Sequence, residues 1–307
     1  TRDPALMDNA RDFAMIEQIN AGRIPGPRYF ATGQRLRPDE YTLTSRADAL
    51  AAVEQLVAAG AVSIKQYLFP NRRQRRWVAE AAREVGVHAT FETGYDYKLA
   101  LGAILDGYNG LEHTPGNHRL HGDFVELARA SGIEYTPTIM TQIGAERFYQ
   151  RVDIDEQPRL KRWIPGAWRL ALKNRTRRGS QVAWSETAYA ALTENAARMA
   201  AASVTVGVGA HDTPSPTGLG THWEIQALVE GGLSPADALR AATIDGARII
   251  GIERHTGSIE PGKLADLLIV EGNPLEDITS KLNARRIVFR GRMLDPLTLE
   301  PVKEPSS

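Results

Sequence analysis

Residues 204–212 read VTVGVGAHD, a run of small and β-branched residues that ends in a histidine and an aspartate. Such a composition is typical of a strand that is buried on both faces. The polar pair His211 and Asp212 then lies where the strand reaches solvent, and α/β barrels place their functional residues at such strand ends. A simple turn is the alternative interpretation, because Thr-Pro-Ser-Pro follows at residues 213–216.

Before this stretch the chain alternates strand-like and helix-like segments. Ser45 followed by Asp48 predicts a helix that begins with a capping box, and Gly86 predicts the end of a second helix. The segments recur at roughly 25 to 35 residues, which predicts repeated βαβ units and a parallel sheet. The expected strands cover residues 28–32, 61–67, 87–93, 110–113 and 133–140, and the expected helices cover residues 4–21, 45–60, 72–85, 97–105 and 119–130.

Residues 141–202 interrupt this alternation of strands and helices, because they are too many for one crossover between strands. They interleave aromatic side chains such as Trp163 and Trp168 with many arginines and lysines. We expect a helical insertion with a solvated basic face, and a lid over a barrel mouth is the alternative. Binding of nucleic acid by this insertion is a third interpretation, which the zero net charge of the chain disfavours.

The C-terminal part has a different character. Ser234 and Pro235 start a helix that is expected to continue to Ile250, and β segments follow at residues 265–270 and 284–289 with Arg290-Gly291 as a hairpin turn. These segments predict a small β subdomain. The expected domains are therefore residues 1–250, with the insertion at about 141–202, and residues 251–307.

Composition narrows the function classes. Lysine plus arginine equals aspartate plus glutamate, 37 against 37, which argues against a nucleic-acid or anionic-membrane partner. The chain has no cysteine, so thiolate metal sites are excluded and any metal must be held by histidine, carboxylate or a modified side chain. No apolar run reaches the length of a membrane span.

Three residues on the expected strands have the chemistry of metal ligands: Lys65, His88 and His113. Burial of Lys65 favours its neutral amine, which can react with carbon dioxide to give an anionic carbamate ligand. Alternatively, Lys65 reaches the rim or pairs with Asp212 or Glu92, and each histidine is a hydrogen-bonded core residue. Lys65, His88, His113 and Asp212 on four different strands together predict a zinc-type site with room for water.

This set resembles the amidohydrolase superfamily, with Lys65, His88, His113 and Asp212 on its fourth, fifth, sixth and eighth barrel strands. The resemblance implies a TIM-type (β/α)8 barrel followed by part of a composite β-sandwich. The tail adds to the resemblance, because it resembles the family's last helix and its return into the β-sandwich: LSPADALRAATIDGARIIGIERHTGSIEPGKLADLLIVEGNPLEDI. Three further segments resemble the branch that is fused behind a TolB-like β-propeller in exported bacterial proteins: KQYLFPNRRQRRW, LDGYNGLEHTPG and GLGTHWEIQALVEGG. A periplasmic or exported location is expected on the same basis.

Two features depart from the family pattern. The sequence contains no His-x-His, the pair that the family's first strand supplies to a metal. Thr1-Arg2-Asp3 resembles the end of the second strand, so we expect an N-terminally truncated fragment whose barrel lacks the first strand and most of the second. The alternative is a degraded, non-catalytic barrel module.

The resemblance implies a metal-dependent hydrolase of carbon–nitrogen bonds in amide or peptide-like substrates. One or two divalent ions, expected to be Zn²⁺, activate a water molecule, and Asp212 acts as general acid and base. His211 and His222 are the candidates for substrate contact, although His222 beside Trp223 also suits a helix surface or a core. A deaminase on the same fold is the enzymatic alternative.

Overall fold

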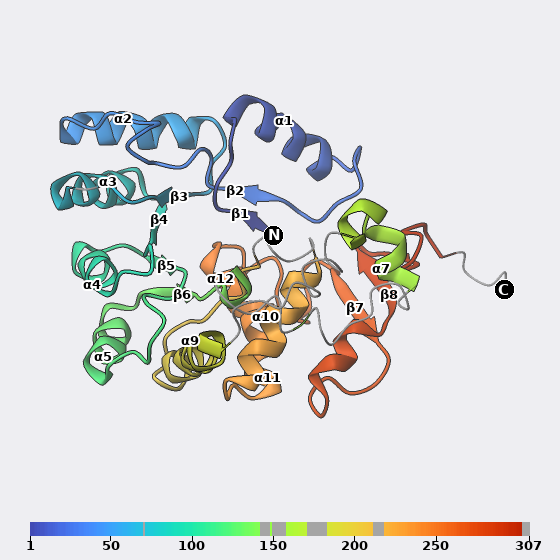
Figure 1. Ribbon diagram of the computed structural model, residues 1–307. Helices are drawn as coiled ribbons and strands as arrows, with labels where there is room; N and C mark the ends of the chain where they lie inside the picture. The colour runs from blue at the N-terminus through green and yellow to red at the C-terminus, as the bar shows by residue number, and fades with distance from the viewer. Residues whose placement is uncertain (70, 142–147, 149–157, 171–182, 211–217, 303–307) are drawn as a thin grey trace. The chain divides into compact units, whose positions relative to one another are not determined.

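The computed structural model describes residues 1–69, 71–141, 148, 158–170, 183–210 and 218–302 (Figure 1). The chain forms two compact units. The first comprises Thr1–Gly116, Leu120–Thr136 and Ala201–Thr205, and the second comprises Asn117–Arg119, Pro137–Ala200 and Val206–Ser307.

A parallel sheet forms the centre of the first unit. Its strands β3 (Ser63–Gln66), β4 (His88–Glu92), β5 (Gly110–Glu112) and β6 (Glu134–Thr136) are paired in that order. The strands β1 (Arg2–Asp3) and β2 (Phe30–Ala31) form a separate parallel pair. The chain after β2 then joins β3, since the N–H of Leu36 donates to the carbonyl of Lys65 at 3.1 Å. The predicted parallel βαβ arrangement is therefore confirmed.

The helices of the first unit alternate with these strands. They are α1 (Asn9–Asn20), α2 (Arg46–Ala58), α3 (Arg72–Val85), α4 (Tyr97–Asp106) and α5 (Gly122–Ser131), and Figure 1 shows α2 to α5 along one side of the four-stranded sheet. The capping box of Ser45 and Asp48 is present at the start of α2. Gly86 ends α3 in the left-handed conformation (φ 81°), as its sequence position predicts.

Between α2, α3 and β3 lies an apolar core that keeps the sheet in place. Its large, fully buried side chains are Leu36, Val53, Leu56, Ile64 and Val78. Truncation of one such leucine or isoleucine to alanine typically costs about 2–5 kcal/mol of unfolding free energy. This packing fixes the strand ends from which the polar side chains project.

The second unit combines helices with an antiparallel sheet. The helices are α7 (Pro158–Trp163), α9 (Ala183–Ala201), α10 (Leu219–Glu230), α11 (Pro235–Ala241) and α12 (Ile244–Ile249), with the 3₁₀ helix η2 (Ile278–Leu282). The sheet pairs β7 (Leu267–Val270), β8 (Ala284–Phe289) and β9 (Arg292–Leu294) in that order. Arg290 and Gly291 both have positive φ in the β8–β9 turn, which suits the predicted hairpin. No helix in the described ranges is both long and apolar enough to cross a membrane.

Two sequence expectations are corrected in this region. The single helix expected after Ser234 is two helices, because Thr243 leaves the helical conformation at φ −125° and ψ −97°. Residues 204–210 form no regular strand, and Val206 makes a single β-bridge. Thr205 still bonds to the parallel sheet, since the N–H of Tyr135 donates to its carbonyl at 2.9 Å.

Candidate active site

Strained backbone follows three neighbouring strands at their carboxyl ends. Tyr95 follows β4, His113 follows β5 and Thr138 follows β6, with φ values of 61°, 68° and 50°. Residues other than glycine rarely adopt this left-handed region, and such strain is concentrated at functional sites. The carboxyl ends of parallel strands are also where barrels carry their active sites. The candidate site is therefore expected at this edge of the sheet.

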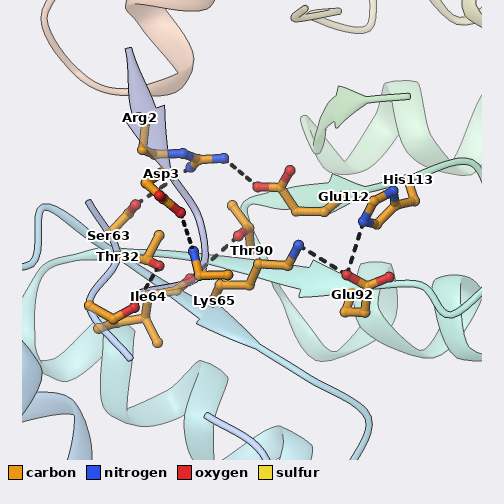
Figure 2. Close-up of polar contacts among 12 residues, drawn as sticks. Arg2, Asp3, Thr32, Ser63, Ile64, Lys65, Thr90, Glu92, Glu112 and His113 are labelled. Carbon is orange, nitrogen blue, oxygen red and sulfur yellow. Dashed lines mark hydrogen bonds and ion pairs between the residues drawn. The ribbon is translucent and has the colours of Figure 1, made fainter. Parts of the chain in front are cut away.

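Lys65 projects from β3 and is 2% exposed. Its ammonium nitrogen Nζ lies 2.9 Å from Oε2 of Glu92, a residue at the carboxyl end of β4 (Figure 2). The same nitrogen lies 4.9 Å from the centre of the Tyr67 ring, which adds a cation–π contact. Of the alternatives considered for Lys65, pairing with Glu92 is the one found.

His113 faces the same carboxylate from the neighbouring strand. Its Nε2 lies 3.1 Å from Oε2 of Glu92, so that one oxygen contacts both nitrogens (Figure 2). The N–H of His113 donates to the carbonyl of Thr136 at 2.9 Å. Its own carbonyl accepts from the hydroxyl of Thr93 at 3.4 Å. These contacts hold the left-handed backbone that directs the imidazole toward Glu92.

A second buried carboxylate belongs to Glu112, the last residue of β5. It forms an ion pair with the guanidinium of Arg2 in β1, whose Nη1 also lies 3.5 Å from the hydroxyl of Ser63 (Figure 2). Arg2 and Glu112 thereby connect the first strand to the central sheet. The buried charges of Arg2, Glu112, Lys65 and Glu92 alternate in sign, which compensates the cost of burying each one.

The electrostatics of this cluster correct one sequence expectation. Burial alone lowers the pKa of Lys65, but the charges of Glu112 and Glu92 outweigh it and the pKa is raised. These two carboxylates favour the charged form of Lys65, whereas the sequence predicted that burial favours the neutral amine. Burial likewise raises the pKa of Glu92, but the hydrogen bond from His113 and the charge of Lys65 lower it to about 2.

His88 is not brought together with Lys65 and His113. It is the first residue of β4, is exposed, and pairs in register with Ser63 at the amino ends of the strands. Because side chains alternate along a strand, His88 shares a face with Glu92 but lies at the opposite end of it. The structure thus places His88 apart from Lys65 and His113, and its assignment as a metal ligand stays a prediction. Glu92, and not His88, lies close to the carboxyl end of the strand expected at residues 87–93, and it is the last residue of β4.

Three further residues were predicted for the site: His211, Asp212 and His222. His211 and Asp212 are outside the described residues. His222 is half-buried in α10 of the second unit, next to the buried Trp223, whose ring stacks on Phe148 with the ring centres 5.8 Å apart. The assignment of Asp212 as a ligand and base, and of His211 and His222 as substrate contacts, stays a prediction.

The sequence argument also missed Glu224 in α10. This glutamate is fully buried, and its two carboxyl oxygens accept the N–H groups of Ile139 and Met140 at 2.7 and 3.0 Å. It thereby holds the turn after β6 that contains the strained Thr138. Burial raises the pKa of Glu224 to about 8, against the opposing effect of the two N–H donors.

The donor chemistry of the cluster suits a divalent metal ion in part. Glu92 and His113 offer a carboxylate and an imidazole side by side, and both are common ligands of zinc. Lys65 adds a third donor if it is converted to a carbamate. Within the described part of the chain, no three histidine, cysteine, aspartate or glutamate side chains gather as a metal site.

The sequence is similar to those of known hydrolases. The sequence profile of the amidohydrolase family matches residues 14–293. Ochratoxinase from Aspergillus niger is 40% identical over 80 residues, which are 25% of this chain and 16% of that protein. Imidazolonepropionase from Symbiobacterium thermophilum is 41% identical over 66 residues, 20% of this chain and 16% of that protein. The matched segments thus span less than a fifth of either relative.

Solved structures resemble this chain over almost its whole length. A Xaa-Pro dipeptidase with bound methionine has a TM-score of 0.70 at 22% identity, and the match covers 96% of this chain and 74% of the dipeptidase. Molinate hydrolase has a TM-score of 0.71 at 18% identity, with 100% and 75% of the two chains covered. At these identities the likeness shows the fold, and the predicted TIM-type α/β fold is confirmed.

Proposed function

The chain belongs to the amidohydrolase family, and on that premise we propose that it hydrolyses carbon–nitrogen bonds in amide or peptide-like substrates. The observation that carries the proposal is the convergence of Lys65, Glu92 and His113 at the carboxyl ends of adjacent parallel strands. Fold alone would not support a function, because one barrel serves many chemistries. A buried cluster of titratable groups at the active-site edge is a specific reason to expect catalysis.

A metal requirement is part of this proposal. A divalent ion, expected to be Zn²⁺, lowers the pKa of a water molecule and polarises an amide carbonyl when it is bound. His113 and Asp212 would hold it, with Lys65 as a further ligand in its carboxylated form. Whether one or two ions bind, and the carboxylation of Lys65, are expectations from the family resemblance.

The chain's own groups then have defined tasks. Asp212 accepts a proton from the attacking water and passes it to the leaving amine, as general base and then general acid. The burial of Lys65 and His113 keeps bulk water from the reacting groups, which strengthens their electrostatic effect on the substrate. His211 and His222 are proposed to contact the substrate.

The experiment compares the chain with its Asp212→Asn variant on a panel of dipeptides and N-acyl amino acids. We expect zinc-dependent turnover that a chelator removes, and a loss of at least about 100-fold in kcat for Asp212→Asn, since general base catalysis contributes that much or more. Full turnover by the variant would remove Asp212 from the mechanism. Turnover that chelation leaves intact would contradict the metal requirement.

A deaminase is the second candidate. One observation favours it: 5-methylthioadenosine/S-adenosylhomocysteine deaminase from Teredinibacter turnerae is 39% identical over 82 residues, 24% of this chain and 19% of that protein. Ammonia release from nucleosides, without cleavage of any amide in the panel, would favour this candidate over the first. Fusion behind a β-propeller and export stay predictions.

A further inference from the structure

We propose that Glu92 is the metal ligand that β4 contributes, in place of the imidazole expected at His88. The inference rests on the proposed function, because it presupposes that the chain binds a divalent ion. It assigns a carboxylate to a position for which the family resemblance implies a histidine.

His88 and Glu92 lie at opposite ends of β4. The strand begins at His88 and ends at Glu92, and four steps of about 3.3 Å separate the two residues by about 13 Å. His88 pairs with Ser63, whereas Glu92 pairs with Glu112, the residue directly before His113. Of the two, Glu92 lies at the end of the sheet where His113 projects.

The second argument is the geometry of the donor atoms. Oε2 of Glu92 lies 3.1 Å from Nε2 of His113, and a ring nitrogen such as Nε2 is the atom through which histidine binds metals. Ligand atoms bind zinc at about 2.0–2.2 Å in a tetrahedron, so neighbouring ligand atoms of one ion are about 3.3–3.6 Å apart. The carboxylate and the imidazole are now joined by a hydrogen bond, and a separation of a few tenths of an ångström brings them to the spacing of two ligands of one ion.

The third argument is the difference between Glu92 and the neighbouring carboxylate, Glu112. Glu112 is ion-paired with the buried guanidinium of Arg2, which keeps its charge in proteins. That pairing neutralises Glu112 within the protein. Glu92 instead faces Lys65 and His113, the two side chains that the family resemblance implies as ligands.

The fourth argument is that the backbone holds the two ligand-bearing segments together. The N–H of Thr93 donates to the carbonyl of Glu112 at 3.3 Å, and the hydroxyl of Thr93 donates to the carbonyl of His113 at 3.4 Å. Thr93 directly follows Glu92 and is fully buried. Glu92 and His113 are thus positioned before any ion binds, which a metal site requires.

The test measures zinc binding by the full chain without substrate. Metal-free protein is titrated with Zn²⁺ against a chromophoric chelator to give the dissociation constant, and elemental analysis counts the bound zinc. Glu92→Gln removes the charge at nearly constant shape, and Glu92→His supplies an imidazole at the same place. His88→Gln is the matched control at the other end of β4.

We expect Glu92→Gln to weaken zinc binding by at least about 10-fold, since even residues that only support a ligand change metal affinity by that factor. His88→Gln should stay within about 2-fold of the unaltered chain, and Glu92→His within about 10-fold. Equal zinc affinity of Glu92→Gln and the unaltered chain overturns the inference. A loss in His88→Gln as large as that in Glu92→Gln overturns it as well.

Failure of the proposed function gives a different result. An unaltered chain that binds no zinc contradicts the metal requirement itself, before any variant is compared. If circular dichroism shows that Glu92→Gln does not fold, Glu92→His decides the question: zinc affinity near that of the unaltered chain supports the inference, and loss of zinc binding overturns it.

Discussion

Glu92 in the first unit and Glu224 in the second are both buried glutamates, yet their pKa values shift in opposite directions. Burial raises the pKa of both. At Glu92 the hydrogen bond from His113 and the charge of Lys65 outweigh burial, and the pKa falls to about 2. At Glu224, within the described part of the chain, two backbone N–H groups oppose burial without outweighing it, and the pKa rises to about 8.

The difference shows that the partners of a buried carboxyl group decide its charge. Glu92 is ionised at neutral pH and can bind a cation. Glu224 is mostly protonated at that pH and stabilises the turn after β6 through its hydrogen bonds with the backbone. The two groups also have opposite linkage to pH. Stability from Glu92 is lost as pH falls from 4.5 toward 2, and stability from Glu224 is lost as pH rises from 4.5 toward 8.

The largest effect is expected from breaking the charge cluster of the first unit. In metal-free protein, Lys65→Met leaves the buried Glu92 without its cation and should lower the free energy of unfolding by about 3–5 kcal/mol. Adding Glu92→Gln removes the unpaired charge, so the double variant should lose less than the sum of the two single changes. Urea unfolding of the three variants measures both quantities. Additive losses would mean that Lys65 and Glu92 do not stabilise each other.

A smaller effect on the free energy of unfolding is expected from Glu224 in the second unit. Between pH 5 and pH 7.5 Glu224 stays protonated in the folded chain and ionises in the unfolded chain, so unfolding free energy should fall by about 3 kcal/mol from this group. Glu224→Gln cannot titrate and should flatten this slope. Urea unfolding at several pH values compares the two proteins. Identical slopes would show that Glu224 is ionised in the folded chain.

The smallest effect is expected where a glutamate is exposed. Glu84 in α3 pairs with Arg46 in α2, but its side chain is 46% exposed. Glu84→Gln should change the free energy of unfolding by less than about 0.5 kcal/mol, because solvent screens exposed ion pairs. The same urea experiment serves as the reference for the two buried glutamates. A loss comparable to that of Lys65→Met would mean that burial does not explain the contrast.

Local signals were sufficient to predict much of the fold. The bounds of α3 match the prediction because Asn71 and Gly86 mark its ends through their own side chain and backbone preferences. The capping box at Ser45 is equally local. The two short helices α11 and α12 were missed because the break at Thr243 leaves no mark in the apolar periodicity.

The site was predicted less completely, because charge states depend on residues distant in sequence. Lys65 and His113 were identified by residue type and strand position. The ionisation of Lys65 was mispredicted, since it depends on Glu112 and Glu92 from two other strands. Glu224 was overlooked because glutamate side chains are usually exposed, whereas most of α10 is buried. His88 was chosen by residue type, when its position along β4 argued for Glu92.

The most direct test of the central claim is a crystal of the chain grown with Zn²⁺ and measured at the zinc absorption edge. The account predicts an anomalous signal adjacent to Oε2 of Glu92 and Nε2 of His113. A zinc signal elsewhere in the molecule, with Glu92 still paired to Lys65, would contradict it.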